Sequence, residues 1–398
     1  MSRSNLEITI IVSPSLPVPP FKGYGGTQRG VWELIKYLRE DYKIRLFAPG
    51  SSSVEVDTLM TNIPFGLWEE GINLSKEERA ILQKSYDRFV IDSLNSNPPQ
   101  LINIHYDSPF IIRQILQRFN CPIIYSPHNQ INTEIRLILE DLIAGRIKRE
   151  APFIIIALSL SHYHEIIKGI PMNFNKNKYI KIIPIYYGCD VEDFPFSPFV
   201  LTDSPEEPSI KILKSLKRKN INYFITIGRI CKIKGQLTAI KLIKEIKGCL
   251  IIAGSVFERE KEQEMDYYKK VLEQCDGKDI IYYGTANEDE KRELMKYAVA
   301  SLYFGGSEDP YWREPFGRVL VESLAVGTPV IAWNQGAITE VIIDGLVGFV
   351  VKTFDECILK INHVKSIDRY LCRMYVDKIF SSRRVAREYK SLIKDVLV

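Results

Sequence analysis

One arrangement occurs twice in this chain and limits its fold more than any other feature. It is an apolar strand, a glycine-containing loop, an amphipathic helix and a second apolar strand. It runs first from LEITIIVSP through QRGVWELIKYLRE to KIRLFAP, and again from INYFITIG through QLTAIKLIKEIKG to CLIIAG. Strands that alternate with helices are typical of α/β folds with parallel sheets. The repeat therefore predicts two Rossmann-type domains, each binding ligands beyond the carboxyl ends of its strands.

Chain length and local composition set the expected domain boundaries. The chain has 398 residues, more than a single core usually takes, so two domains are expected. Residues 1–195 form the predicted N-terminal domain, with a mostly helical insertion at about 51–99 whose role the sequence does not reveal. A linker rich in Pro, Ser and Lys is predicted at 196–220, the C-terminal domain at 221–378 and a terminal helix at 379–398.

The charge balance and the cysteines argue against several classes. A net charge of +4, from 53 basic and 49 acidic residues, predicts no nucleic-acid partner, although it suits an anionic small ligand. Seven scattered cysteines without a C-x-x-C pair predict neither a disulfide framework nor a zinc site, so a cytoplasmic location is expected. Apolar runs such as APFIIIALSL are too short to cross a bilayer, which leaves peripheral contact with the inner face of a membrane open.

The first glycine loop, GYGGTQRG, places Gly25, Gly26 and Thr27 before a helix. Glycines let a backbone approach a phosphate closely, and a helix N-terminus favours negative charge. Gln28 stands where the dinucleotide fingerprint needs its third glycine, and no acid ends the second strand, so an NAD dehydrogenase is disfavoured. A tight strand-to-helix turn explains these glycines equally well.

Basic residues and histidines follow other predicted strands. Arg229 and Lys234, in GRICKIKG, suit a diphosphate clamp, with the arginine as a fork and the lysine as a point charge. His105 and His128 end buried strands, where packing is as good an explanation as a role in the site. His162 and His164, in SLSHYHE, are interpreted as surface residues. No Asp-x-Asp occurs, so the usual carboxylate grip on a metal–nucleotide complex is missing.

Glu314 and Glu322 bracket a Pro-Phe-Gly turn in DPYWREPFGRVLVESLAVGTPVIAW. Eight helical residues would separate them by about 12 Å at 1.5 Å per residue. The two acids of a glycosidase stand roughly 5 to 9.5 Å apart, so that chemistry is disfavoured. Acids on either side of a helix N-terminus suit a long ligand with a charged middle, such as a nucleotide-sugar. Helix capping and solvation would account for them as well.

Four segments together resemble a known family. GYGGTQR, GRICKIKGQ, EPFGRVLVESLAVGTPVIAW and GAITEVIIDGLVGFVV, in this order, resemble the family 4 retaining glycosyltransferases of the GT-B fold, also grouped as glycosyl transferases group 1. FSSRRVAREYKSLI resembles that family's final crossing helix. The resemblance covers nearly the whole chain and is weakest at 51–99 and around the linker. It implies two Rossmann-like domains whose parallel sheets face each other across a cleft, with a C-terminal helix that crosses back to the N-terminal domain.

The resemblance also implies roles for individual residues. Glu314 matches the residue that faces the donor sugar, Glu322 the one that binds the ribose hydroxyls, and His128 the one that contacts the transferred sugar. Arg229 and Lys234 would neutralise the departing diphosphate, which makes them catalytic with His128 and Glu314. The implied donor-binding residues are Gly25, Gly26, Thr27, Gly254, Gly284, Thr285, Phe316, Gly317, Arg318 and Glu322. One departure is IYYGCDVEDF, because family members commonly show Asn-Gly-Val-Asp there.

The implied activity is transfer of a sugar, with retention, from a nucleotide-diphosphate sugar to a hydroxyl acceptor. The resemblance implies no metal and no cofactor, and the donor base and sugar stay open. The acceptor could be a lipid-linked or protein-linked glycan or a small molecule. The basic stretch KILKSLKRKN could touch anionic lipid, although a solvated linker explains it more simply. The alternatives are a nucleotide-sugar epimerase or hydrolase on the same fold and a non-catalytic sugar-nucleotide sensor.

Overall fold

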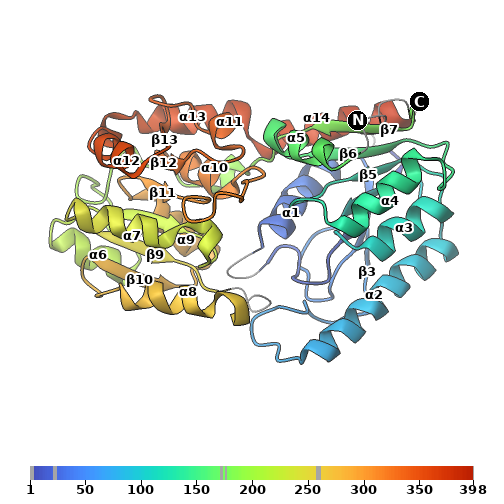
Figure 1. The fold of residues 1–398 in the computed structure, drawn as a ribbon, viewed down its shortest axis with the longest axis horizontal. Helices are drawn as coiled ribbons and strands as arrows, with labels where there is room; N and C mark the ends of the chain where they lie inside the picture. The colour runs from blue at the N-terminus through green and yellow to red at the C-terminus, as the bar shows by residue number, and fades with distance from the viewer. Residues whose placement is uncertain (1–3, 21–24, 171–173, 175–176, 257–260, 398) are drawn as a thin grey trace. The chain divides into compact units, whose positions relative to one another are not determined.

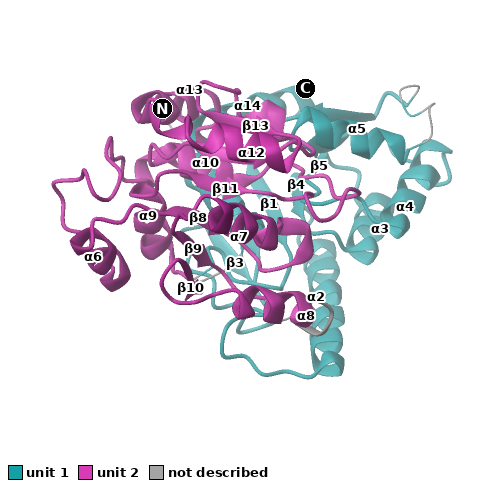
Figure 2. Cartoon of the chain, turned by 60° about the vertical axis from the view of Figure 1, so that its left-hand side comes forward, with its two compact units in different colours: residues 1–20, 25–187, 382–398 teal, residues 21–24, 188–381 magenta. Residues whose placement is uncertain are grey.

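The computed structural model describes residues 4–20, 25–170, 174, 177–256 and 261–397 (Figure 1). The chain forms two compact units, coloured separately in Figure 2. The first contains residues 1–20, 25–187 and 382–398, and the second contains 188–381. Each unit is built on one parallel sheet, so the α/β architecture with two Rossmann-like domains is confirmed.

The first unit has a seven-stranded sheet in the order β3-β2-β1-β4-β5-β6-β7, with every pair parallel. Its strands are β1 (Glu7–Val12), β2 (Lys43–Phe47), β3 (Thr58–Met60), β4 (Leu101–His105), β5 (Ile123–Tyr125), β6 (Phe153–Ala157) and β7 (Ile180–Pro184). Its helices are α1 (Gly26–Leu38), α2 (Lys76–Ser96), α3 (Pro109–Arg118), α4 (Thr133–Ile143), α5 (Leu160–Lys168) and α14 (Ser382–Leu397).

Two apolar cores cover the faces of this sheet, because successive side chains of a strand point to opposite sides. In β1, Ile8 and Ile10 pack with α1 and α14 on one face, whereas Ile11 joins the other face. That second face is covered by α2, α3 and α4, which lie side by side in Figure 1. Burial on both faces explains why these strands read as nearly continuous apolar runs.

The terminal helix α14 packs on the first unit, as the sequence predicted. Ser382 Oγ donates a hydrogen bond of 2.6 Å to the buried Glu33 of α1. The buried hydroxyl of Tyr389 lies 2.9 Å from that of Ser126, just after β5. The chain therefore leaves the first unit after Tyr187 and returns to it at Ser382.

The second unit has a six-stranded parallel sheet in the order β10-β9-β8-β11-β12-β13. Its strands are β8 (Phe224–Ile227), β9 (Leu250–Ala253), β10 (Ile280–Gly284), β11 (Ser301–Tyr303), β12 (Val330–Trp333) and β13 (Gly348–Val351). Its α-helices are α6 (Lys211–Arg218), α7 (Gln236–Glu245), α8 (Lys261–Glu273), α9 (Glu288–Lys296), α10 (Arg318–Ala325), α11 (Ile338–Val341), α12 (Phe354–Ile361) and α13 (Arg369–Ile379). Short 3₁₀ turns are η2 (Val191–Asp193), η3 (Lys232–Lys234) and η5 (Val364–Ser366).

The predicted linker at 196–220 is wrong. The compact second unit already begins at residue 188, not after a boundary at 195. Leu201, Leu213 and Leu216 are buried in its core, the last two on α6. The Lys-rich composition suggested a solvated linker, although Leu213 and Leu216 are three residues apart and so lie on the same face of a helix. The terminal helix likewise begins at Ser382 rather than 379, because α13 runs on to Ile379.

The insertion at 51–99 is only partly helical. It contributes the edge strand β3 before α2 begins at a capping box, in which Ser75 Oγ accepts from the Glu78 amide and the Glu78 carboxylate accepts from the Ser75 amide. Among the described residues, the structure contains no helix whose length and apolarity would let it span a bilayer.

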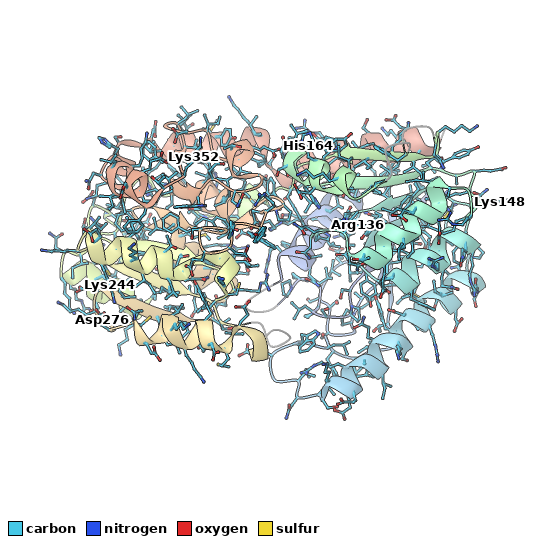
Figure 3. All side chains as sticks on the ribbon, in the orientation of Figure 1. Arg136, Lys148, His164, Lys244, Asp276 and Lys352 are labelled. Carbon is cyan, nitrogen blue, oxygen red and sulfur yellow. The ribbon has the colours of Figure 1, made fainter. Side chains whose placement is uncertain are left out.

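His162 is buried, which corrects the interpretation of His162 and His164 as a surface pair. Residues two apart on a helix point in different directions, so His164 is exposed on α5, where Figure 3 labels it. His162 Nδ1 accepts from the Leu158 amide at 3.1 Å, and Nε2 lies 3.1 Å from the Asn129 carbonyl. Burial lowers the pKa of His162 to about 4, so this ring is neutral near pH 7.

This burial predicts a loss of stability in mild acid. The unfolded chain takes up a proton on His162 below its ordinary pKa of about 6.5, whereas the folded chain resists it down to about 4. The free energy of unfolding should fall by about 2 kcal/mol between pH 6.5 and 5.0 on account of this residue. Urea unfolding should show that His162→Gln has a smaller pH dependence than the parent. His164→Gln, the exposed neighbour, should keep the parental dependence; equal slopes for both variants would contradict the assignment.

Candidate functional site

Three glycine loops meet at the carboxyl edge of the second sheet. The amide of Gly228, after β8, donates to Ala253, and the amide of Gly254, after β9, donates to Gly284 at the end of β10, at 3.1 and 2.8 Å. Gly254 has φ +145°, and a Cβ there would lie 1.9 Å from the Gly228 carbonyl oxygen. Gly254 therefore has to be glycine for these backbones to approach, which leaves main-chain groups as the lining of this edge.

The half-buried Lys234 and the buried Glu314 form an ion pair beside these loops. Lys234 Nζ lies 2.8 Å from Glu314 Oε2 and 3.0 Å from the hydroxyl of Tyr303, and that hydroxyl donates to the same carboxylate oxygen. The lysine also sits 5.3 Å from the ring centre of Tyr303 and 5.4 Å from that of Trp312. The cation is thus held by one carboxylate, one hydroxyl and two aromatic rings.

Each partner keeps its charge because of the other. Burial opposes the charged form of Glu314, but Lys234 and the Tyr303 hydroxyl outweigh it and hold the pKa of Glu314 below its ordinary value. Burial likewise opposes the charge of Lys234, but Glu314 outweighs it and raises the pKa of this ammonium. At neutral pH both groups are therefore ionised.

The backbone around Glu314 is fixed by the loop after β12. The Ala337 amide donates to the Glu314 carbonyl at 2.9 Å, and Gly336 lies so close that a Cβ there would meet the Glu314 amide nitrogen at 2.4 Å. Gly317 then turns the chain with φ +89° and precedes the first residue of α10. The E-P-F-G sequence therefore places the buried carboxylate of Glu314 and the start of α10 in the same turn, whose backbone is fixed.

Glu322 sits in a separate ion-pair network on α10. Its Oε1 lies 3.3 Å from Arg318, one turn earlier, and its Oε2 lies 3.2 Å from Lys291 of α9. Lys291 also bridges to Glu288 at 2.9 Å. Glu314 and Glu322 are thus each paired with cations of their own unit, as expected for two acids that do not act as a close carboxylate pair.

The other predicted site residues of the second unit differ in the exposure and the contacts of their side chains. The Arg229 carbonyl accepts from Gln236 Nε2 at 2.7 Å, which closes the loop that carries Lys234. Phe316 is buried with its ring centre 5.6 Å from that of Phe380, and Arg318 also donates to the Gly188 carbonyl at 3.0 Å. Thr285 is exposed beside Gly284. Phe316 can therefore reach a ligand only through its backbone.

In the first unit, Gly25, Gly26 and Thr27 lie at the N-terminus of the 13-residue helix α1. Among the described residues, no side chain caps this helix end, and the first amides of a helix are groups that suit an anion. A Cβ on Gly25 would meet the ring of Pro20 at 2.5 Å. Packing against Pro20 is thus enough to explain why residue 25 is a glycine. The feature of this segment that suits a phosphate is the N-terminus of α1.

His128 follows β5 and belongs to a chain of three side chains. Its Nε2 lies 3.0 Å from His105 Nδ1, and its Nδ1 lies 3.0 Å from the hydroxyl of Tyr187. Sequence analysis named both histidines as strand-end residues but did not connect them. Tyr187 was not singled out at all.

Two residues of the second unit, Tyr303 and Lys291, were likewise not predicted from the sequence to belong to the site. Tyr303 is the last residue of β11, and its place at the carboxyl end of a parallel strand was a usable signal. Lys291 lies inside the polar helix α9, where nothing local distinguishes it from its charged neighbours. Among the described residues, no group of three or more His, Cys, Asp or Glu side chains is arranged to hold a metal ion.

Two parallel-sheet units, with a terminal helix that returns to the first, define a protein of the GT-B class. Solved structures share this fold. The structure of Anabaena Alr3699/HepE in complex with UDP and glucose has a TM-score of 0.71 at 16% identity, over 98% of this chain and 100% of that one. Sucrose-phosphate synthase from Thermosynechococcus elongatus has a TM-score of 0.72 at 17% identity, over 98% and 99%.

Sequence comparison finds a family match in the second unit. Residues 210–372 match the family model described as Glycosyl transferases group 1, which confirms that resemblance. The match covers Lys234, Tyr303, Glu314 and Glu322 and begins inside the segment that had been predicted to be a linker. YtcC of Bacillus subtilis (strain 168) is 21% identical over 411 residues, which cover 98% of this chain and 93% of YtcC.

The Lys234–Glu314 pair predicts a specific pattern of stability. Lys234→Met would leave a carboxylate buried without its cation and should lower the free energy of unfolding by about 3–5 kcal/mol at pH 7. The loss should shrink as the pH falls, because the unpaired Glu314 then takes up a proton. Adding Glu314→Gln to Lys234→Met should restore most of the stability.

Lys278→Met provides the matched control, because Lys278 pairs with Asp279 on the surface of the same unit. It should change stability by less than about 0.5 kcal/mol. Urea unfolding of the parent and these three variants at pH 7 and pH 5 would measure these differences. A Lys234→Met variant no less stable than Lys278→Met would show that the pair is not held out of water.

Proposed function

We propose that this protein is a family 4 glycosyltransferase that moves a sugar from a nucleotide-diphosphate sugar to a hydroxyl acceptor, with retention and without a metal. The observation that carries the proposal is the buried Lys234–Glu314–Tyr303 cluster at the carboxyl edge of the second sheet. This cluster lies inside the segment that matches Glycosyl transferases group 1. Ligands of open parallel sheets bind at this edge.

Lys234 supplies a movable positive charge in this proposal. A donor diphosphate would draw the ammonium from Glu314 to phosphate oxygens, with Arg229 on the same loop as a second cation. The freed Glu314 carboxylate would then accept hydrogen bonds from hydroxyls of the donor sugar. As the bond to the sugar breaks, negative charge grows on the leaving phosphate, and cations already placed beside the bound diphosphate stabilise that charge.

Glu322 would hold the ribose of the donor. A carboxylate can accept from both ribose hydroxyls, and Arg318 and Lys291 already keep this one in place. The backbones of Gly254, Gly284, Thr285, Phe316 and Gly317 would contact the base and phosphates. In the first unit, Gly25, Gly26 and Thr27 would contact the diphosphate, and His128 the transferred sugar. The leaving phosphate would take the proton of the acceptor hydroxyl. The acceptor oxygen would then attack the anomeric carbon from the side on which the phosphate departs, so the configuration of the sugar is retained.

A uridine nucleotide is the donor to test first. HepE has been solved in complex with UDP and glucose and in complex with UDP-glucose. The acceptor we propose is a glycan hydroxyl, lipid-linked or protein-linked, with a small molecule as the other option. A cytoplasmic location is proposed with it, at the inner face of a membrane if the acceptor is lipid-linked.

Nucleotide binding can be tested without knowing the acceptor. In a thermal-shift panel of UDP-, GDP-, ADP- and TDP-glucose with EDTA present, we expect one nucleotide to stabilise the protein. Ligand at a hundred times its dissociation constant should add about 2.7 kcal/mol. Stabilisation that appears only when Mg²⁺ replaces EDTA would contradict metal independence, and no response to any nucleotide would contradict the donor site.

Turnover separates transfer from the alternatives. Slow release of UDP from UDP-sugar should fall at least about a hundredfold in Glu314→Gln and in Arg229→Ala. Glu273→Gln, an exposed residue of α8, should match the parent. An altered sugar still attached to its nucleotide would indicate an epimerase, and binding without turnover on any acceptor would indicate a sensor. Parental rates in Glu314→Gln would overturn the assigned chemistry.

A further inference from the structure

Tyr187 touches two of the elements that carry predicted site residues in the first unit. Its hydroxyl lies 3.0 Å from Nδ1 of His128, and the ring centres of these two residues are 5.5 Å apart. Its ring also lies against Gly30 of α1, the helix that begins at Gly26. Tyr187 is the last residue of the first unit before the chain enters the second.

Gly30 shows that this placement is built into the fold. Glycine weakens the interior of a helix relative to alanine, so a glycine in the second turn of α1 needs a reason. A Cβ at Gly30 would lie 2.1 Å from Cε1 and 2.5 Å from the hydroxyl oxygen of Tyr187. No side chain larger than hydrogen fits while the tyrosine is in place, so helix α1 leaves room for the Tyr187 ring.

His105 holds the other nitrogen of His128. His105 is buried, and burial lowers its pKa to about 3, so its ring is neutral and carries a single N–H. Its Nε2 has no hydrogen-bond partner among the residues that the structure describes. This nitrogen is unpaired in either tautomer, and an orphaned buried N–H is rarer in folded proteins than an orphaned acceptor. Placed on Nδ1, the ring proton is donated to Nε2 of His128 at 3.0 Å.

The tautomer of His105 also sets the direction of the hydrogen bond between His128 and Tyr187. If Nε2 of His128 accepts from His105, the proton of a neutral His128 ring lies on Nδ1. Nδ1–H then donates to the oxygen of Tyr187. Both ring nitrogens are thus engaged by groups of the same unit, and the ring cannot flip without breaking two hydrogen bonds.

We propose that Tyr187 and His105 are positioning residues that fix the orientation and the Nδ1–H tautomer of His128. The consequence for turnover rests on the proposed function, in which His128 contacts the transferred sugar; the positioning itself does not. Residue 187 is also where the chain departs from the Asn-Gly-Val-Asp pattern of the family it resembles, and the hydrogen bond to His128 gives that tyrosine a physical role.

The direct test reads the ring of His128 by NMR in protein labelled with ¹⁵N-histidine. The chain has only five histidines, and a His128→Gln sample identifies the signals of this one. In the parent we expect Nδ1 to carry the proton and Nε2 to show the shift of an acceptor. A parental His128 that carries its proton on Nε2, or exchanges between tautomers, would overturn the proposal without any variant at position 187.

Tyr187→Phe removes the hydroxyl and keeps the ring against Gly30. We expect the Nδ1–H signal of His128 to shift because its acceptor is lost while the bond to His105 remains, with kcat about tenfold lower and KM for the donor within about twofold of the parent. Tyr86→Phe, which removes a buried hydroxyl that donates to Val12 in the same unit, should leave the His128 signals unchanged. Unchanged His128 signals in Tyr187→Phe would reject Tyr187 as a positioning residue.

The two proposals fail in different ways. If the parent binds and turns over no nucleotide-sugar, the proposed function fails while the NMR result still decides whether Tyr187 and His105 hold His128. If the parent is active and Tyr187→Phe changes neither the His128 signals nor kcat, the positioning role of Tyr187 fails and the proposed function stands.

Discussion

A lysine and a glutamate are held out of water together at the carboxyl edge of the second sheet, and neither charge could be buried alone. Lys234 enters from the loop after β8, whereas Glu314 lies in the turn before α10, eighty positions later in the chain. The Tyr303 hydroxyl joins them from a third segment, and the loop after β12 fixes the backbone of Glu314. Three loops and the end of β11 thus converge on one pair of charges, and the site inherits its rigidity from that convergence.

The pattern of charges also says what an incoming ligand must do. Glu314 is paired with Lys234, and Glu322 with Arg318 and Lys291. In the proposed function, a diphosphate would take Lys234 from Glu314, and hydroxyls would bond to both carboxylates while Arg318 and Lys291 stay beside Glu322. A neutral ligand would have to separate the buried pairs without offering a charge in return.

Sequence reasoning worked where the physics is local and failed where it depends on distant segments. Strand and helix periodicity predicted both parallel sheets. Position after a strand drew attention to Lys234 and the turn before a helix to Glu314, and their roles stay predictions. That these two pair, and that Tyr303 joins them, depends on which strands are neighbours in the sheet. The linker was predicted wrongly because the many lysines of this segment outweighed the helical spacing of Leu213 and Leu216, which are buried. His162 could have been placed from helix geometry, since it cannot share the environment of His164.

Adjacent residues at the exit from the first unit serve different clusters. The hydroxyl of Tyr187 bonds to His128 of its own unit, whereas the carbonyl of the next residue, Gly188, accepts from Arg318, which also holds Glu322. The covalent connection is therefore not a neutral spacer. A chimera that joins this first unit to the second unit of a relative needs two cuts, one between Tyr187 and Gly188 and the other before Ser382. At the first of these, a cut one residue earlier would give His128 a foreign partner, and one residue later would give the relative's arginine a foreign carbonyl.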